Sequence, residues 1–339
     1  MKAAVCTRYG PAAEVLRIAD LEKPVPKPNE VRIRIHATVV TGSDVIVRGS
    51  RISPTLWLPM RIVIGFKGPR NPILGFILAG QVESCGRDAR RFEAGDRVFG
   101  STMMPDVSVG SGLYDQLMGA VIKQKVAGLM GTYAEYKCLP QSCLITTMPS
   151  NTPYEQAAAI PYGAGLALYF LRKGQVASGQ KVLVYGASGS VGSSAVQLAK
   201  HLGAEVTGVC STGNLELVRS LGADAVVDYT AEDFTGRGEL FDLILDAVPS
   251  YGTSNRGHLK SQCEKALAPG GKHVSIDSGR PAYYADDLIL MKELVEQGAL
   301  RPVIDRCYPL ERLAEAHEYV ETGHKKGNVV ITLADDASS

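Results

Sequence analysis

The sequence has no excess of charge of either sign. Its 339 residues include 36 Lys and Arg and 35 Asp and Glu, so the formal net charge is +1. Proteins that bind nucleic acids or anionic lipid surfaces usually concentrate Lys and Arg, and this composition gives no sign of such an excess. We therefore expect neither a nucleic-acid partner nor a membrane partner.

Long hydrophobic runs are also lacking. One of the longest uncharged stretches, residues 156–171, has 16 residues and contains a proline and two glycines, whereas a membrane-spanning helix needs about 20 apolar residues. The first ten residues have neither the long apolar region nor the small-residue cleavage site of a secretory signal. These absences predict a cytoplasmic protein.

The seven cysteines form no Cys-x-x-Cys pair. They are scattered over positions 6, 85, 138, 143, 210, 263 and 307. Disulfide scaffolds and cysteine metal sites use paired or clustered thiols, so this pattern favours a reducing compartment and excludes both classes.

The length predicts two domains, at about 150 residues for each. The first 150 residues look β-rich: residues 31–35, 75–85 and 132–138 are typical of strands, and Gly, Pro and Asp turns separate them. Short strands at this spacing predict a sandwich or a partly open barrel.

From about residue 150 strands and helices alternate, which predicts a parallel sheet covered on both faces. The expected elements are strand 181–185, helix 191–202, strand 205–210, helix 214–221, strands 225–229 and 241–248, helix 258–267 and strand 272–277, then helices 286–297 and 310–321 and strand 328–333.

Residues 101–131 fit neither pattern. Apolar residues at 113, 117, 118, 121, 122, 126 and 129 would share one face of a helix. We expect an inserted amphipathic helix over the barrel, and a flexible loop is the alternative.

A glycine-rich turn joins the predicted strand 181–185 to the helix that follows. In this position a glycine triplet is typical of a dinucleotide-binding loop, because the first glycine makes the turn, the second admits a pyrophosphate and the third lets helix and strand pack. Amide groups at the helix start favour the negative phosphates. We expect the dinucleotide to contact Gly186, Ala187, Ser188, Gly189, Ser190, Val191 and Gly192.

The end of the next strand favours NADPH over NADH. An acid there would bind a ribose 2′-hydroxyl and repel a 2′-phosphate, but the residues are Ser211, Thr212 and Asn214. Lys325 and Lys326 could supply positive charge. Other candidate cofactor residues follow predicted parallel strands, where such sheets bind ligands: Tyr229, Asp246, Ala247, Val248, Ser275 and Ile276.

Nearly the whole chain resembles the medium-chain dehydrogenase/reductase superfamily, and most closely its quinone oxidoreductase-like branch. The resemblance is carried by ILG at 73–75, AGQVE at 79–83, GDRVFG at 95–100, GTYAEY at 131–136, LGADAVVDY at 221–229, FDLILD at 241–246 and GHKKGNVVI at 323–331.

This resemblance implies a GroES-like substrate domain, residues 1–149 and 284–339, and a Rossmann doubly wound α/β domain, residues 150–283. It also implies a homodimer, and a C-terminal turn with Lys325 and Asn328 on the cofactor side. The family's turn before the Rossmann domain corresponds to residues 164–167.

Two positions that bind the catalytic zinc in the superfamily are occupied here by Thr41 and Phe76. The matching stretch around Tyr162 has no Cys for a third ligand. Phe cannot bind zinc and Thr is a poor ligand, so we expect no zinc.

The resemblance places Thr41, Ser43 and Asp44 near the nicotinamide. Asp44 could instead cap a helix at 45–48. Tyr133 could donate a proton or only pack the domain, and water is another proton source. Candidates for an apolar acceptor pocket, with core packing as the alternative, are Trp57, Tyr114 and Tyr162.

The predicted activity is NADPH-dependent, zinc-free reduction of quinones or α,β-unsaturated carbonyl compounds. Hydride addition to a conjugated system needs mainly positioning and one or two hydrogen-bond donors. One alternative is a 2-enoyl-thioester (enoyl-CoA) reductase, and another is an NADPH-binding redox sensor without turnover. The first alternative would use a basic entrance made by Arg48, Arg51, Arg61, Lys67 and Arg70.

Overall fold

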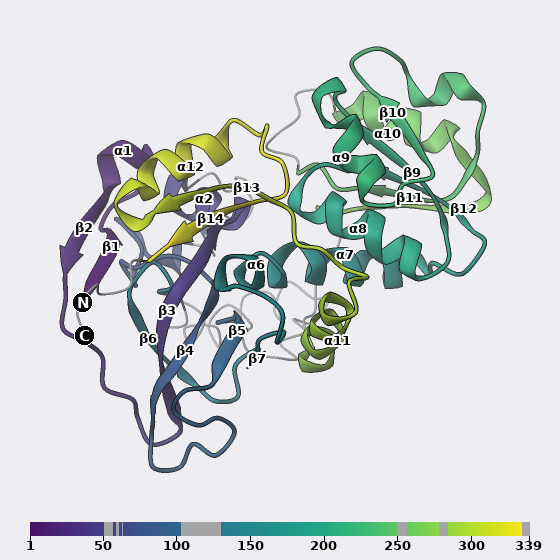
Figure 1. Cartoon of the computed structure of the whole chain (residues 1–339). Helices are drawn as coiled ribbons and strands as arrows, with labels where there is room; N and C mark the ends of the chain where they lie inside the picture. Colours follow the sequence, from purple (N-terminus) through teal and green to yellow (C-terminus); the bar gives the residue numbers. More distant parts are fainter. Residues whose placement is uncertain are drawn as a thin grey trace.

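The computed structural model describes residues 1–50, 57–58, 61–62, 64–102, 130–249, 256–277 and 284–333. The described residues form a seven-stranded sheet, a five-stranded parallel sheet and a two-stranded sheet, with helices packed around them (Figure 1). The helix predicted within residues 101–131, together with Tyr114, falls almost entirely in residues 103–129, outside the described residues. No described helix has the length and apolar composition needed to span a membrane.

The seven-stranded sheet gathers strands from both ends of the chain. Six strands lie in the order β13-β14-β3-β4-β5-β7, and β6 pairs with β3. Its strands are β3 (Glu30–Val40), β4 (Ile77–Cys85), β5 (Arg97–Ser101), β6 (Tyr136–Pro140), β7 (Ile145–Thr147), β13 (Ile304–Pro309) and β14 (Asn328–Thr332). In β3 the predicted alternation is confirmed, because Val31, Ile33 and Ile35 are buried between the partly exposed Arg32 and Arg34.

Smaller elements flank this sheet. The two-stranded sheet pairs β1 with β2, and α2 lies against α12. The bounds are β1 (Lys2–Cys6), α1 (Ala12–Val15), β2 (Leu16–Asp20), α2 (Gly42–Gly49), η4 (Leu310–Arg312) and α12 (Leu313–Glu321).

The predicted parallel sheet is confirmed, in the order β10-β9-β8-β11-β12. Its strands are β8 (Lys181–Tyr185), β9 (Glu205–Cys210), β10 (Ala225–Asp228), β11 (Phe241–Asp246) and β12 (Leu267–Ser275). The connecting helices are α8 (Ser190–His201), η1 (Thr212–Asn214), α9 (Leu215–Ser220), η2 (Phe234–Arg237) and α10 (Arg256–Lys265).

Both faces of the parallel sheet are covered. Val182 and Val184 belong to the core cluster that includes Ala195 of α8, whereas Leu183 belongs to a second cluster that includes Leu259 of α10. Successive residues of one strand thus enter opposite cores, which explains why β8 is apolar throughout.

The stretch 156–171 was assigned no helix from the sequence, and this was wrong. It contributes to α6 (Tyr154–Ala158) and α7 (Pro161–Gly174), so residues 164–167 lie inside a helix and form no turn. Pro161 occupies the first turn, where a missing N–H costs little. Gly163 is needed for close packing, because a Cβ atom on it would lie 2.4 Å from the Ser190 carbonyl oxygen.

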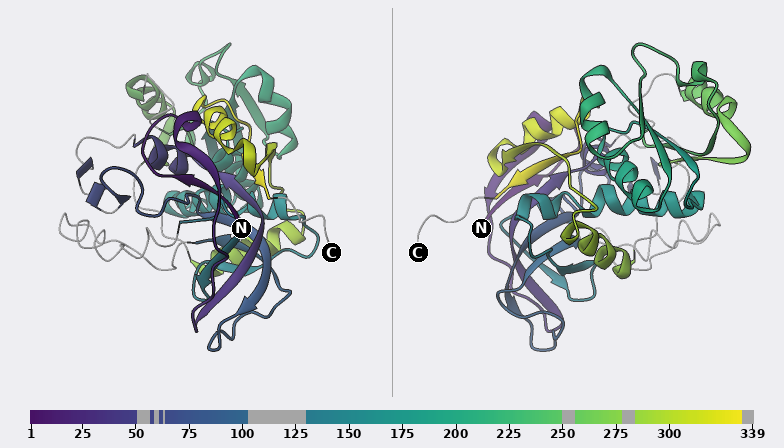
Figure 2. Two further views of the ribbon diagram at one scale, coloured as in Figure 1. Left: turned by 90° about the vertical axis from the view of Figure 1, so that its left-hand side faces the viewer. Right: turned by 45° about the vertical axis from the view of Figure 1, so that its right-hand side comes forward.

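The C-terminal segment returns to the first sheet, as the resemblance implies. β14 pairs antiparallel with β3 and parallel with β13, and the yellow strands lie beside the purple one in Figure 1. Before this return, α11 (Ala285–Glu296) packs against α7 and β7 (Figure 2). One buried cluster therefore continues from Phe99 of β5 to Leu245 of β11.

Candidate functional site

The glycine loop, residues 186–192, leaves the carboxyl end of β8 and starts α8. Gly186 has a φ of +77°, and a Cβ atom on it would lie 2.6 Å from Val248 Cγ2. A Cβ atom on Gly192 would lie 2.1 Å from the Gly186 carbonyl oxygen. Only glycine fits at these two positions.

The middle glycine differs from the other two. The nearest atom to a Cβ placed on Gly189 is the Gly186 carbonyl oxygen, at 3.5 Å, an ordinary contact. Gly189 is also the N-cap residue of α8, where helix amides have no partner within the helix. The loop therefore has an open face at its middle glycine and tight packing at the other two, which fits a dinucleotide pyrophosphate.

Asn214 connects the glycine loop to the turn that follows β9. Its Nδ2 donates to Ser188 Oγ at 3.0 Å and to Ser211 Oγ at 3.1 Å. Each serine accepts in this contact and keeps its own proton for another acceptor. Asn214 is 8% exposed, and its Oδ1 has no hydrogen-bond partner among the described residues. This cluster offers two hydroxyl donors and one amide acceptor at the ligand edge of the sheet.

An acid lies beside this turn that the sequence analysis missed. Thr212 donates its hydroxyl proton to Asp228 Oδ2 at 2.6 Å, and Thr230 donates to Oδ1 of the same carboxylate. Both bonds lower the pKa of Asp228, so it is ionised at neutral pH. Thr212 is therefore engaged with a carboxylate. The sequence did contain a sign of this acid, because Asp228 ends β10, the strand that pairs with β9.

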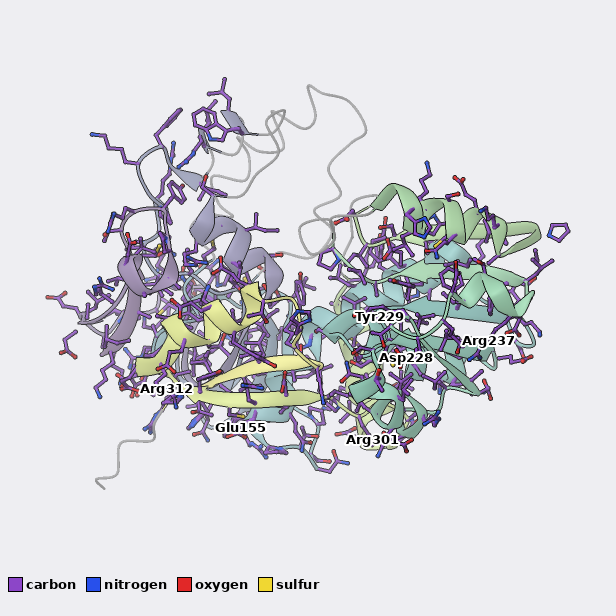
Figure 3. The ribbon with its side chains drawn as sticks, turned by 90° about the horizontal axis from the view of Figure 1, so that it is seen from above. Glu155, Asp228, Tyr229, Arg237, Arg301 and Arg312 are labelled. Atoms are coloured by element: carbon purple, nitrogen blue, oxygen red, sulfur yellow. The ribbon has the colours of Figure 1, made fainter. Side chains whose placement is uncertain are left out.

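Tyr229 follows this acid and is 49% exposed. Its ring lies 6.2 Å from that of Tyr185, and Figure 3 shows Asp228 and Tyr229 side by side on the parallel-sheet part of the molecule. A half-exposed ring at this edge offers an aromatic face to a ligand.

The C-terminal turn, residues 325–328, docks on the glycine loop. The Gly327 amide donates to the Ser188 carbonyl oxygen at 2.8 Å, and Ser190 Oγ donates to Asn328 Oδ1 at 2.6 Å. Burial lowers the pKa of Lys325 to about 8. Lys326 Nζ donates to the Gly213 carbonyl oxygen at 3.4 Å. Lys326 thus reaches the turn after β9, whereas Lys325 Nζ donates to the Gly327 carbonyl oxygen within its own turn.

The remaining cofactor candidates follow β11 and β12 at the same edge. The Ala247 amide donates to the Tyr185 carbonyl oxygen at 2.9 Å, and the Ile276 amide donates to that of Asp246 at 3.0 Å. Val248 contacts Gly186, as described above, and Ser275 ends β12. The structure therefore brings the cofactor candidates of all five parallel strands together.

A hollow, called the acceptor cleft for the role proposed below, lies at the start of α7, where Gly163 packs on Ser190 of α8. It encloses about 720 Å³, including the space open to solvent at its mouth. Its described lining is Thr41, Ser43, Phe76, Ile77, Ser101, Leu144, Pro161, Tyr162, Gly165, Tyr284, Asp287, Leu288 and Met291. The wall is mainly apolar, and three helices, α2, α7 and α11, begin at it.

Thr41 and Asp44 form a capping box at the start of α2. The Thr41 hydroxyl donates to Asp44 Oδ2 at 2.7 Å, and the Thr41 amide donates to the same oxygen at 2.8 Å. Asp44 is fully buried, and burial raises its pKa to about 6. Asp44 does take part in capping, but Thr41 is the N-cap and Asp44 is the third residue of a helix that covers Gly42–Gly49 and not 45–48. Thr41 is the member of the pair that lines the cleft.

Tyr133 is not brought to the cleft. It is fully buried, its ring meets the buried His317 edge-on at 5.7 Å, and it is not among the described lining residues. Trp57 is 44% exposed and also absent from that lining. Of the aromatic candidates with described positions, Tyr162 is the one at the cleft, where its hydroxyl lies 3.3 Å from Ser43 Oγ.

The basic entrance suggested for an enoyl-thioester is not formed as expected. Arg48 is 1% exposed and donates to Glu321 and to the Gly10 carbonyl oxygen, so it belongs to the interior. Arg61 lies over the Tyr9 ring and donates to a carbonyl oxygen of its own loop. Lys67 and Arg70 are exposed, and Arg51 is outside the described residues.

The residues at the expected zinc position do not fit the metal. Thr41, Phe76 and Tyr162 all line the cleft, and they offer hydroxyl groups and a hydrocarbon ring where zinc prefers thiolates, imidazoles and carboxylates. Within the described ranges, no three His, Cys, Asp or Glu residues gather in a group that could hold a metal ion.

Family models match two parts of the chain. Residues 27–150 match the alcohol dehydrogenase GroES-like domain, and residues 221–289 and 280–331 match the zinc-binding dehydrogenase domain. The term zinc-binding describes the family. In this chain the side chains at the expected zinc position do not fit the metal.

Curated relatives match over nearly the full chain. A 2-methylene-furan-3-one reductase of Solanum lycopersicum is 29% identical, over 98% of this chain and 79% of its own length. The mitochondrial NAD(P)H oxidoreductase RTN4IP1 of Mus musculus is 30% identical, over 98% of this chain and 89% of its own length.

A solved quinone oxidoreductase from Coxiella burnetii has the same fold, with a TM-score of 0.75, 24% identity and coverage of 98% and 99% of the two chains. With the GroES-like sheet, the glycine loop and the C-terminal return described above, these matches identify the family. The chain is an oxidoreductase of the medium-chain dehydrogenase/reductase superfamily and belongs to its quinone oxidoreductase-like branch.

Proposed function

We propose that this protein is an NADPH-dependent reductase of quinones or α,β-unsaturated carbonyl compounds that works without zinc. The observation that carries the proposal is an apolar cleft, with hydroxyl groups where the superfamily binds zinc, beside a dinucleotide-type glycine loop. The activities named for two relatives, a 2-methylene-furan-3-one reductase and an NAD(P)H oxidoreductase, support the same class.

The lining of the cleft favours conjugated acceptors. Bound NADPH would supply a hydride. The acceptor's conjugated electrons then shift to its carbonyl oxygen, and one proton from water completes the product. Because this charge is spread over the conjugated system, hydrogen-bond donors and helix N-termini are sufficient to stabilise it. An isolated alkoxide would need stronger stabilisation, such as a metal supplies.

The choice of NADPH rests on the groups around Asn214. Among the described residues neither Ser188 nor Ser211 donates its hydroxyl proton, and Lys326 reaches the same turn, so a phosphate would find donors and a cation there. Asp228 opposes this preference, because its negative charge lies beside Thr212. We therefore expect NADPH to be preferred by a moderate factor.

The full chain should oxidise NADPH when mixed with quinones, alkenals or enones, as measured by the loss of NADPH absorbance. NADH should support slower turnover with the same acceptors. An enoyl-CoA that outperforms all small carbonyls would replace the proposal with the thioester reductase. Tight NADPH binding in a calorimeter without turnover of any acceptor would identify the redox sensor.

A further inference from the structure

Two hydroxyl groups meet in the acceptor cleft from segments far apart in the chain. Ser43 lies in the first turn of α2 and Tyr162 in the first turn of α7. Ser43 Oγ and Tyr162 Oη are 3.3 Å apart, and both residues line the cleft. Ser43 was placed near the nicotinamide only by resemblance, and Tyr162 was considered only as a wall residue.

The pair has one hydroxyl proton available to a bound ligand. Two hydroxyls carry two protons, and the bond between them uses one, so one O–H remains for a third oxygen. The neighbouring Thr41 does not offer the same, because its proton is held by Asp44 at 2.7 Å. Burial raises the pKa of Tyr162, so its hydroxyl keeps its proton at neutral pH.

Two helix ends near the pair favour negative charge on a bound oxygen, whereas burial and the charges of Asp44 and Asp277 oppose it and raise the pKa of Tyr162. α2 and α7 both direct their amino-terminal ends to the cleft, and the partial positive charge of a helix N-terminus stabilises an anion nearby. The carboxylate of Asp287 in the cleft wall is paired with Arg172 of α7. Phe76 and Met291 contribute apolar walls, which strengthen polar interactions inside the cleft.

The pair also lies next to the cofactor loop. Gly163 follows Tyr162 directly and packs on the Ser190 carbonyl oxygen, where α8 begins. A flat acceptor in the cleft would therefore have its oxygen at the hydroxyl pair and its body towards the end of the glycine loop.

Building on the function proposed above, we propose that Ser43 and Tyr162 together donate a hydrogen bond to the carbonyl oxygen of the acceptor. The hydride adds to the electron-poor carbon, the π electrons move to this oxygen, and the pair holds the resulting enolate. Water protonates the carbon next to the carbonyl group, so neither hydroxyl loses its proton overall. Acceptors without a carbonyl oxygen in conjugation should bind without being reduced.

The ionisation of 4-nitrophenol tests this site without cofactor or turnover. Its phenolate resembles an enolate, so a donor site should lower the pKa of the bound phenol, as followed by its visible absorbance. We expect Tyr162→Phe and Ser43→Ala each to raise the pKa of the bound phenol relative to the wild-type protein, because the remaining hydroxyl is no longer oriented by its partner. Tyr169→Phe, on the same helix, removes a hydroxyl that is not among the described lining residues and is the matched control. Equal bound pKa values in all four proteins would overturn the inference.

Kinetics then separates this inference from the proposed function. Each single variant keeps one O–H but loses the partner that orients it, so kcat for an enone should fall about 10-fold. The double variant Ser43→Ala/Tyr162→Phe has no hydroxyl proton of the pair left and should lose about 100-fold, with the NADPH dissociation constant unchanged in all three. Full activity in the double variant Ser43→Ala/Tyr162→Phe would refute the donor pair and leave the reductase standing. A wild-type protein that reduces no acceptor, yet lowers the pKa of the phenol through Tyr162, would refute the reductase and keep the anion site.

Discussion

The glycine loop and the acceptor cleft adjoin each other but are built in different ways. The loop comes from one continuous segment of seven residues, and its shape depends on backbone conformation and on missing Cβ atoms. The cleft combines side chains from α2, β4, α7 and α11, whose first and last members are more than 240 residues apart. A backbone site should fail when an atom is added, whereas a side-chain site should fail when one is removed.

The largest expected effect is at Gly192. In Gly192→Ala the new methyl group would lie 2.1 Å from the Gly186 carbonyl oxygen, so helix and strand would have to separate. We expect a loss of about 3 kcal/mol in the free energy of unfolding, measured by urea denaturation.

The matched variant is Gly189→Ala, whose methyl group meets nothing closer than 3.5 Å. It should fold almost normally and bind NADPH about 10- to 100-fold more weakly, because the open face of the loop is filled. Normal NADPH affinity in folded Gly189→Ala would show that the pyrophosphate lies elsewhere.

The next effect is the pH dependence of stability at Asp44. Burial raises its pKa from 3.8 to about 6, so the folded protein holds this proton more tightly than the unfolded chain. The contribution of this proton to the free energy of unfolding is present below about pH 4 and is lost as the pH rises through about 6. The wild-type free energy of unfolding should therefore decline by roughly 2–3 kcal/mol as the pH rises. Asp44→Asn, which can still accept a hydrogen bond from Thr41, should remove this decline. Parallel stability curves for both proteins between these pH values would contradict the assigned burial of the carboxyl group.

Charge around the turn after β9 should set the choice between NADPH and NADH. Lys326→Met removes the cation near Gly213 and should lower the NADPH preference about 10-fold. Asp228→Asn removes the opposing charge and should raise this preference by a similar or smaller factor. Calorimetric titration of both variants with both nucleotides gives the ratios. If both variants shift the ratio in the same direction, the electrostatic explanation is wrong.

The smallest effect concerns Lys325. Its pKa is lowered to about 8, so its positive charge is present below that pH and is lost above it. If Lys325 contributes to phosphate binding, NADPH affinity should fall a few-fold between pH 7 and 9, and Lys325→Met should show a flatter profile. The same steep fall in both proteins would assign it to another group.

The glycine loop and the acceptor cleft also differ in how far the sequence predicts them. Strands 181–185 and 205–210 were predicted with their observed bounds, because buried parallel strands and glycine turns are local signals. Helix α7 was missed, because its glycines and proline normally argue against a helix. Pro161 is tolerated in the first turn, and Gly163 is explained only by its packing on Ser190.

The partners within each site were harder to predict. Asn214 was recognised as a cofactor candidate, but its bonds to Ser188 and Ser211 depend on the parallel pairing of β8 and β9. Asp228 was overlooked for the same reason, since it ends a different strand. The pairing of Ser43 with Tyr162 depends on how two distant helices pack, which no local pattern reports.

The most direct test of the account follows the hydride itself. The full chain is incubated with NADPH carrying deuterium at C4 of the nicotinamide and with an α,β-unsaturated ketone, and the product is analysed by mass spectrometry and NMR. The account predicts a saturated ketone with one deuterium on the alkene carbon farther from the carbonyl group. An allylic alcohol with deuterium on the carbonyl carbon would show that this cleft carries out alcohol dehydrogenase chemistry, and would contradict the account.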